Sequence, residues 1–361
     1  MTESDNAALN AAEPAADAAT TPAQPFSPEA PAGSPTTPEA AAPFGQRTDL
    51  SQLSAAAARV RDTLGQRVIG QHGIVELLLT ALLADGHVLL EGVPGVAKTL
   101  MAKLLARSID VPFSRVQFTP DLMPADVLGT SIFRPQHGDF SFRPGPIFAS
   151  VVLIDEINRA PAKTQAALFE VMEERQMTHD GVRHVLPEPF AVLATQNPVE
   201  QEGTYRLPEA QLDRFLFKIS VGYPTAEEET RILELHHQGP NDLADIQPVL
   251  TAADIAALRQ QVRRQHVEPK LLDYMARLVS HTRNHPALYL GASPRASLAL
   301  LNGSKALAAL RGRDFVTPED VQELAPSVLR HRIMLTPERE LEGQTPDDVV
   351  KQLLQSLEVP R

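Results

Sequence analysis

Lys98 and Thr99 are the residues whose types and spacing most clearly suggest chemistry, here the binding of phosphate and magnesium. They follow a glycine-containing loop. The loop, GVPGVAKT over residues 92–99, comes after a short apolar run, Val88 to Leu90, typical of a buried parallel strand. Glycines let such a loop turn tightly enough to point its N–H groups at an anion, and a helical pattern then begins. Backbone amides would cradle phosphates, the lysine would neutralise them, and the hydroxyl would bind magnesium.

The loop departs from the usual pattern at Ala97, where a glycine normally precedes the lysine. An ordinary strand–helix turn can also carry glycines, so the loop alone leaves both interpretations open. The apolar pair Val68 and Ile69, upstream of the loop, would by itself be interpreted as part of the hydrophobic core. Because a phosphate-binding loop follows, a contact of this pair with the adenine ring is favoured. The residues expected to contact the nucleotide are Val68, Ile69, Gly92, Val93, Pro94, Gly95, Val96, Ala97, Lys98, Thr99 and Leu100.

Two acidic residues, Asp155 and Glu156, directly follow a second apolar run, Val151 to Ile154. Such a strand places carboxylates at the carboxyl edge of a parallel sheet, where these folds bind ligands. Asp155 would hold magnesium through its water shell, and Glu156 would orient or polarise the attacking water. An ordinary acidic turn is the alternative interpretation.

Two further polar side chains fit the same site. Asn197 follows the apolar run 191–195, where it would hold the water or the γ-phosphate, although an Asn before Pro is also a good turn former. Arg214, next to Asp213, is interpreted as a finger that reaches the γ-phosphate of a neighbouring subunit. A surface salt bridge between these two neighbours is the alternative.

A third arginine, Arg295, lies in the first turn of a helix that Ser293 and Pro294 begin. A cation there opposes the helix dipole, at a cost of a few tenths of a kcal/mol that a protein tolerates easily. The alternative is that Arg295 points at a nucleotide phosphate, which would make the helical domain a lid that senses ATP.

The chain is expected to divide into three parts. Residues 1–47 are rich in Ala and Pro with acids, and predict a disordered leader, either a solvated tail or a docking arm. Residues 48–238 predict an α/β nucleotide-binding domain with hairpin insertions near 128–149 and 177–190. After a hinge at Gly239-Pro240, residues 239–361 are expected to be entirely helical.

Composition excludes several classes of protein. The absence of cysteine excludes disulfides and thiolate metal sites. No run of eighteen apolar residues spans a membrane, and the first residues lack the pattern of a signal peptide, so we expect a cytoplasmic protein. The net charge of −12 argues against non-specific nucleic-acid binding.

The motifs GVPGVAKT, VVLIDEINRA, ATQNP, LPEAQLDRF and GASPRA, in this order, resemble the MoxR family of AAA+ ATPases over roughly residues 50 to 361. The family often has alanine before the lysine, so Ala97 fits it. The resemblance implies an α/β core with a helical lid, and the two hairpin insertions resemble the branch shared by MoxR proteins and magnesium-chelatase ATPase subunits.

The resemblance also implies roles for individual residues. Lys98 and Thr99 match the first nucleotide motif, Asp155 and Glu156 match the second, and Asn197 matches the first sensor. Arg214 matches the finger given in trans, a role that the nearby Arg206 could share, and Arg295 matches the second sensor. ATP and Mg²⁺ would be the ligands. The implied assembly is a homo-oligomeric ring, most often of six subunits, with von Willebrand A domain proteins as partners and client remodelling as the task.

Besides an ATP-hydrolysing chaperone, the sequence leaves two other functions open: a nucleotide-controlled scaffold, and a nucleic-acid motor or transcription activator. A nucleotide-controlled scaffold would need no water-polarising Glu156 and no finger in trans. A nucleic-acid motor or transcription activator would need a basic recognition helix, which the sequence lacks, and Phe133 or Phe142 is better explained by hairpin packing. His281 and His285 are spaced one helical turn apart without the accompanying Glu of zinc proteases, so we expect no further metal site.

Overall fold

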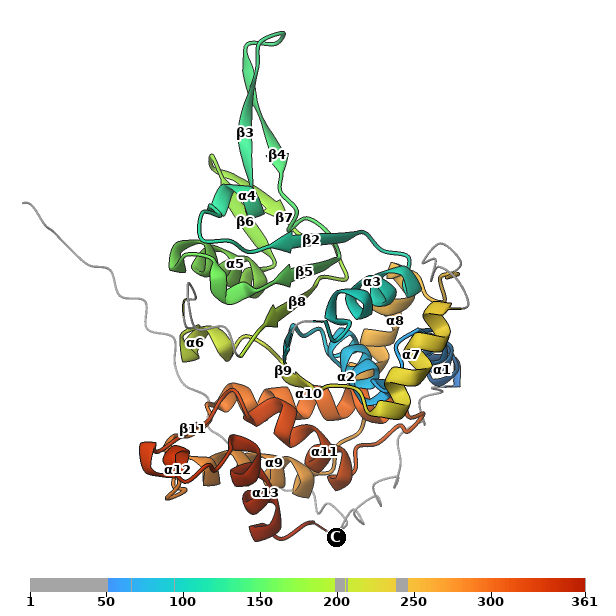
Figure 1. Ribbon diagram of the computed structural model, residues 1–361, viewed down its shortest axis with the longest axis vertical. Helices are drawn as coiled ribbons and strands as arrows, with labels where there is room; N and C mark the ends of the chain where they lie inside the picture. The colour runs from blue at the N-terminus through green and yellow to red at the C-terminus, as the bar shows by residue number, and fades with distance from the viewer. Residues whose placement is uncertain are drawn as a thin grey trace, which may run out of the picture. The chain divides into compact units, whose positions relative to one another are not determined.

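Three apolar runs predicted as buried strands form the centre of a parallel sheet in the computed structural model. The structure describes residues 51–65, 67–93, 95–198, 205, 207–237 and 246–360. The strands are β1 (Val88–Gly92), β2 (Phe113–Gln117), β5 (Val151–Asp155), β8 (Ala191–Gln196) and β9 (Phe217–Val221), in the order β2-β5-β8-β1-β9. All neighbouring pairs are parallel, so Gly92, Asp155 and Gln196 end at one edge of the sheet (Figure 1). Strand β9 was not predicted from the sequence.

Alternate residues of the central strands point to opposite faces, and each face has its own core. Val88 and Leu90 of β1 pack with α1 (Ser51–Gly65), α2 (His72–Leu83) and α3 (Lys98–Ser108). Leu89, between them, packs on the other face with α5 (Ala162–Glu174). The period of two thus builds a three-layer α/β domain, as the sequence predicted.

Both predicted hairpin insertions are present. β3 (Gly129–Arg134) pairs with β4 (Asp139–Pro144), after the short α4 (Pro124–Leu128), and β6 (Gln176–His179) pairs with β7 (Val182–Val185). The turn of the second hairpin is Asp180-Gly181, in which both residues have positive φ, +48° and +75°. That is the turn type that matches the twist of paired strands.

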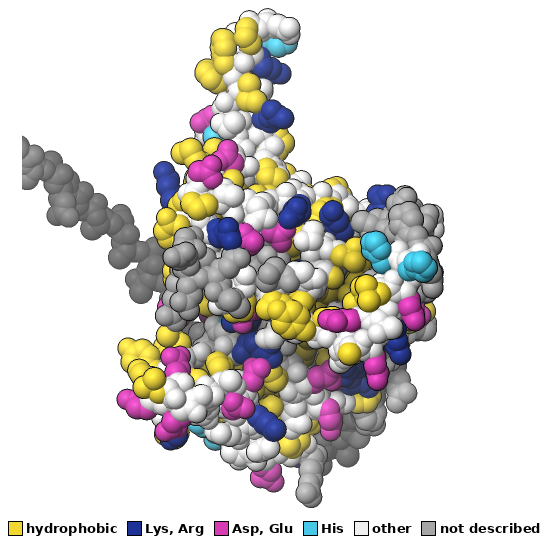
Figure 2. All heavy atoms as spheres, in the orientation of Figure 1, with side chains coloured by type: hydrophobic (Ala, Val, Ile, Leu, Met, Phe, Trp, Pro, Cys, Tyr) yellow, Lys and Arg dark blue, Asp and Glu magenta, His cyan; other side chains and the backbone are white. Residues whose placement is uncertain are grey.

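The β3–β4 hairpin projects away from the sheet at the top of Figure 1. Figure 2 shows hydrophobic and basic side chains along it, and Phe133 and Phe140 are exposed there although their rings pair at 5.2 Å. Phe142, nearer the base, packs on His184 of the other hairpin, with ring centres 4.2 Å apart. Packing between the two hairpins therefore accounts for the aromatic residue at position 142. Phe133 packs against Phe140 and is otherwise largely exposed.

The C-terminal part is helical, and its main helices begin at the predicted caps. Thr251 and Thr317 each form a capping box with the acid three residues later, and Ser293 accepts a hydrogen bond from the backbone of Arg295. Two helices precede this part, α6 (Glu209–Leu212) and α7 (Ala226–His237). The helices of the C-terminal part are α8 (Ala252–Arg263), α9 (Pro269–Thr282), α10 (Pro294–Leu310), α11 (Pro318–Leu329), α12 (Pro337–Leu341) and α13 (Pro346–Ser356).

One feature departs from the expectation of an entirely helical C-terminal part. β10 (Leu288–Leu290) pairs with β11 (Met334–Leu335) in a short antiparallel sheet. Strands of two or three residues carry no readable alternation, and these two form because the helices around them bring the segments together. The predicted leader and the hinge at Gly239-Pro240 lie outside the described residues, so the domain boundaries stay a prediction. Among the residues described, no helix is both long and apolar enough to cross a membrane.

Two buried histidines join the sheet to its surroundings. His87 accepts a hydrogen bond from the backbone N–H of Val192 through Nδ1, so its Nε2 donates to the carbonyl of Met172, at 3.1 Å. Burial, together with nearby Arg175, lowers the pKa of His87 from 6.5 to about 3. Burial also lowers the pKa of His331 well below its ordinary value.

These histidines predict a loss of stability in mild acid. Below pH 6.5 the unfolded chain binds protons that the folded protein excludes. The free energy of unfolding should therefore fall by about 1.4 kcal/mol per pH unit for each histidine, between pH 6.5 and the folded pKa. Urea unfolding at pH 7, 6 and 5 measures this slope. His87→Gln should flatten it by about 1.4 kcal/mol per unit. Equal slopes for the native protein and His87→Gln would refute the assignment.

Candidate nucleotide-binding site

The loop between β1 and α3 holds the predicted phosphate-binding residues. A Cβ atom on Gly92 would lie 2.5 Å from the carbonyl oxygen of Val221, so only glycine fits beside β9. Gly95 has a φ of +89°, which glycine adopts without strain. The ammonium of Lys98 donates to the Gly92 carbonyl over 2.5 Å, and Thr99 stands in the first turn of α3. The loop therefore ends in a helix N-terminus, an anion-binding arrangement.

Ala97, the departure noted in the sequence, is the N-cap of α3 and has a φ of +58°. A left-handed conformation costs an alanine about 1 kcal/mol, which explains why glycine is usual at this position. Strain of this size is typical of backbone held in place at functional sites. Pro94 and Arg206 lie outside the described residues.

Asp155 ends β5 at the same edge of the sheet as the loop. Its Oδ2 is 2.6 Å from Nε of Arg115, and its Oδ1 accepts a hydrogen bond of 3.2 Å from the hydroxyl of Thr195. Arg115, which lies on the neighbouring strand β2, was not predicted from the sequence. A cation that binds Asp155 would have to share its carboxylate with this arginine.

Glu156 has a left-handed backbone, with a φ of +57°, and a carboxylate held by two side chains. Nε2 of Gln117 donates to its Oε2 over 2.8 Å, and Nε of Arg159 lies 2.9 Å from the same oxygen. Its backbone N–H donates to Thr195, the residue that also binds Asp155. The two acids are therefore oriented together. Gln117 was also missed, and the signal for it is a polar residue at the carboxyl end of a strand.

The remaining predicted residues outside the loop are Asn197, Val68 and Ile69. Asn197 follows β8, which lies between β5 and β1, so the chain places it between the acids and the loop. It is nearly buried. Val68 is 2% exposed and belongs to the core, whereas Ile69 is half-buried. The adenine contact stays a prediction.

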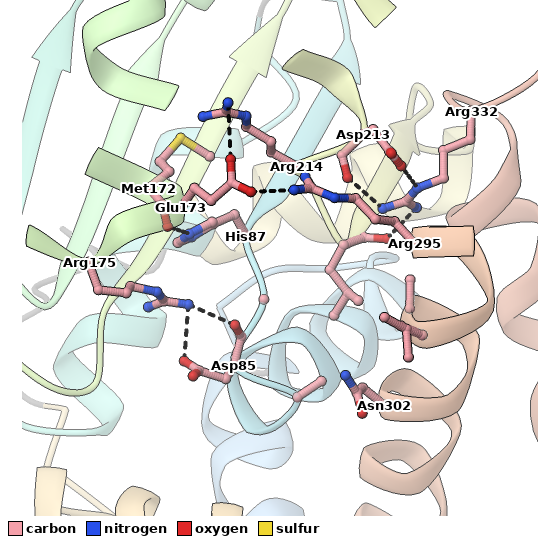
Figure 3. A pocket seen from close by; sticks show the side chains of 15 residues that line it. Asp85, His87, Met172, Glu173, Arg175, Asp213, Arg214, Arg295, Asn302 and Arg332 are labelled. Carbon is pink, nitrogen blue, oxygen red and sulfur yellow. Dashed lines mark hydrogen bonds and ion pairs between the residues drawn. The ribbon is translucent and has the colours of Figure 1, made fainter. Parts of the chain in front are cut away.

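Arg214 and Arg295 meet elsewhere, on one side chain of α5. Nη2 of Arg214 is 3.0 Å from Oε2 of Glu173, and its Nη1 donates to the carbonyl oxygen of Phe169. Nη2 of Arg295 donates to the other carboxylate oxygen of Glu173 (Figure 3). A single carboxylate thus brings together guanidinium groups from the sheet domain and from α10.

This arginine cluster lies at the edge of the sheet opposite the loop. Met172, next to Glu173, binds His87, which immediately precedes β1, whereas the loop follows Gly92 at the other end of that strand. A strand of five residues spans about 15 Å. One subunit therefore does not gather the predicted residues around a single nucleotide, and Arg295 does not face the loop of its own chain.

A hollow of about 260 Å³ adjoins the arginine cluster. Its charged lining consists of four arginines and three acids, which are Arg175, Arg214, Arg295, Arg332, Asp85, Glu173 and Asp213. The excess of one positive charge suits an anion. The alternative interpretation of Arg214 was a surface salt bridge with Asp213. Arg214 does form a salt bridge, but with Glu173, whereas Asp213 binds Arg332 at 2.6 Å.

The residues at the loop fit magnesium. No group of three or more His, Cys, Asp or Glu side chains that could hold a metal occurs in the part of the chain that the structure describes. Magnesium bound with a nucleotide needs fewer protein ligands, because phosphate and water oxygens complete its coordination. The Thr99 hydroxyl and the Asp155 carboxylate are oxygen donors of the kind it prefers.

Two family descriptions match the chain. Residues 87–217 match the ATPase family associated with various cellular activities (AAA), and residues 280–353 match an AAA lid domain. The first range covers most of the sheet with both hairpins, and the second covers the helices from the end of α9 to α13.

Individual proteins extend this similarity over most of the chain. Chaperone MoxR1 of Mycobacterium tuberculosis is 44% identical over 92% of this chain and 90% of its own length. Protein MoxR of Paracoccus denitrificans is 33% identical over 80% of this chain and 92% of its own. The crystal structure of a candidate ATPase from Cytophaga hutchinsonii superposes with a TM-score of 0.81 and 39% identity, covering 86% of this chain and 97% of that one.

Proposed function

Because this chain belongs to the MoxR family of AAA+ ATPases, we propose that it hydrolyses ATP and uses the reaction to remodel client proteins. The fold supports this proposal, since a parallel sheet with a phosphate-binding loop is followed by an AAA lid domain. The observation that most supports it is that the predicted site residues lie at two opposite ends of the sheet strands, with the loop and the two acids at one end and Arg214 and Arg295 at the other.

The loop edge would bind ATP and activate water. Lys98 would neutralise the outer phosphates, and Thr99 with Asp155 would hold Mg²⁺, which when bound offsets charge on the phosphate oxygens. Glu156, oriented by Gln117 and Arg159, would accept a proton from the attacking water. Asn197 would hold that water or the γ-phosphate.

The arginine edge would complete the site of a neighbouring subunit. Arg214 and Arg295 already converge on one anionic group, Glu173, so they can converge on a terminal phosphate as well. A head-to-tail contact of one edge with the other closes into a ring when the rotation permits, and six subunits is the proposed number. Arg295 would then sense the neighbour's nucleotide instead of its own.

The proposed task is chaperone-like, as the name of the mycobacterial relative, chaperone MoxR1, suggests for that protein. We propose a von Willebrand A domain protein as partner and the cytoplasm as location. No role for nucleic acid is proposed.

A shared site predicts that hydrolysis depends on assembly as well as on magnesium. Phosphate release by the purified full-length chain should require both ATP and Mg²⁺ and should fall when EDTA is added. The rate per subunit should rise with protein concentration, in parallel with the formation of a ring in analytical ultracentrifugation. A monomer that hydrolyses ATP at a rate per subunit independent of concentration would contradict the shared site.

A further inference from the structure

Arg332, which follows α11, is the most completely bonded arginine near the finger. Its side chain is 3% exposed, and its Nε lies 2.6 Å from Oδ1 of Asp213. Its Nη1 donates to the carbonyl of Leu216 at 3.1 Å and to that of Val328 at 2.6 Å. Its Nη2 donates to the carbonyls of Asp213 and Phe215, at 3.1 and 2.5 Å. All five N–H donors of the guanidinium are thereby used.

Four of these five bonds end on the segment 213–216, which contains Arg214. The other carboxylate oxygen of Asp213 accepts a hydrogen bond of 2.8 Å from Ser293, the N-cap of α10. Ser293 lies two residues before Arg295. The backbones that carry both arginines of the cluster are therefore tied to one pair, Asp213 and Arg332.

The hydrogen bonds of the Asp213–Arg332 pair hold the segment 213–216 in a way that apolar contacts would not. Apolar contacts would bury the same segment, but they are not directional. A planar guanidinium with five used donors fixes both the position and the orientation of the backbone that it binds. Arg332 belongs to the helical C-terminal part, so a shift of α11 relative to the sheet would carry segment 213–216 with it.

We propose that Arg332 is the positioning residue for Arg214: through Asp213 it sets the finger in the place from which it reaches the neighbour's nucleotide, and it couples the position of the lid to hydrolysis in the next subunit. This inference rests on the proposed function, in which Arg214 acts in trans. Positioning of Arg214 by Arg332 is separate from the binding of ATP by the phosphate-binding loop, because the loop lies at the other edge of the sheet.

The variant Arg332→Lys tests this role, because lysine keeps the charge but has three donors in place of a rigid set of five. We expect kcat to fall about tenfold or more, with KM for ATP and the affinity for a fluorescent ATP analogue unchanged within about twofold. Asp213→Asn, which keeps the shape of the carboxylate, should act in the same way and serves if the lysine variant does not fold. Arg330→Lys is the matched control, since Arg330 binds Ser220 and Asp347 and should keep native activity.

Mixed rings separate positioning from a structural role. Glu156→Gln subunits lack the water-activating group but keep the finger, whereas Arg332→Lys subunits keep that group and lack a well-placed finger. Mixing the two before ATP is added should restore the same fraction of native activity as mixing Glu156→Gln with Arg214→Ala. If only the Arg214→Ala pair recovers, Arg332 is merely structural and the inference is wrong. If neither pair recovers, the finger does not act in trans, and the proposed function fails with the inference.

Discussion

Replacing Glu156 by glutamine is expected to lower kcat for ATP hydrolysis about a hundredfold or more, while ATP affinity stays within about twofold of the native value. Glutamine has nearly the same shape and can still accept the hydrogen bond that Gln117 donates over 2.8 Å. It cannot take a proton from the attacking water. The phosphate-binding loop belongs to another segment, so binding should persist. Phosphate release and titration with a fluorescent ATP analogue measure the two quantities separately.

The matched control for this substitution is Glu170→Gln, an exposed glutamate on α5. It removes the same charge from the same domain and should leave kcat unchanged. The thermal stability of Glu156→Gln should also stay close to native, because the carboxylate is partly exposed and exposed ion pairs such as that with Arg159 stabilise little. Turnover that survives in Glu156→Gln would show that this residue does not activate the water.

The loop edge of the site could be predicted because each of its residues is fixed by local sequence. Asp155 ends one buried apolar strand and Asn197 follows another, and the carboxyl ends of parallel strands share one edge. Lys98 begins the helix that follows the glycine loop. In each case the signal lies within a few residues, and the sheet brings the segments together without further information.

The arginine edge could not be predicted in the same way. Arg295 binds Glu173, a residue 122 positions away in the sequence, and its place depends on how the lid packs against the sheet. Arg115 and Gln117 were missed for a related reason. Their contacts with the acids exist because β2 pairs with β5, and strand order cannot be read from hydrophobic patterns. The motif GASPRA therefore predicted an arginine at the start of α10, but it did not predict that this arginine would bind Glu173.

Replacing Arg214 by alanine is expected to lower kcat about a thousandfold or more, because the loss of an arginine finger removes charge stabilisation from the transition state of phosphoryl transfer. The nucleotide affinity of the variant's own loop should stay native, since that loop lies at the other edge of the sheet. Folding should be little affected, because Glu173 keeps its bond to Arg295. Phosphate release, analogue binding and thermal unfolding measure these three effects.

Mixing then decides whether the finger acts between subunits. Rings of Arg214→Ala alone or of Glu156→Gln alone should turn over ATP at no more than about a hundredth of the native rate. In a ring of randomly mixed equal parts, a site is complete when an Arg214→Ala subunit supplies Glu156 and its neighbour supplies Arg214. Such sites make up about one quarter of the total, so about one quarter of the native rate should return. A finger that served its own chain's nucleotide would give no recovery at any ratio, because each subunit would still lack one of the two groups. Recovery at equal parts, declining toward either pure variant, is therefore the result that the separation of the two edges requires.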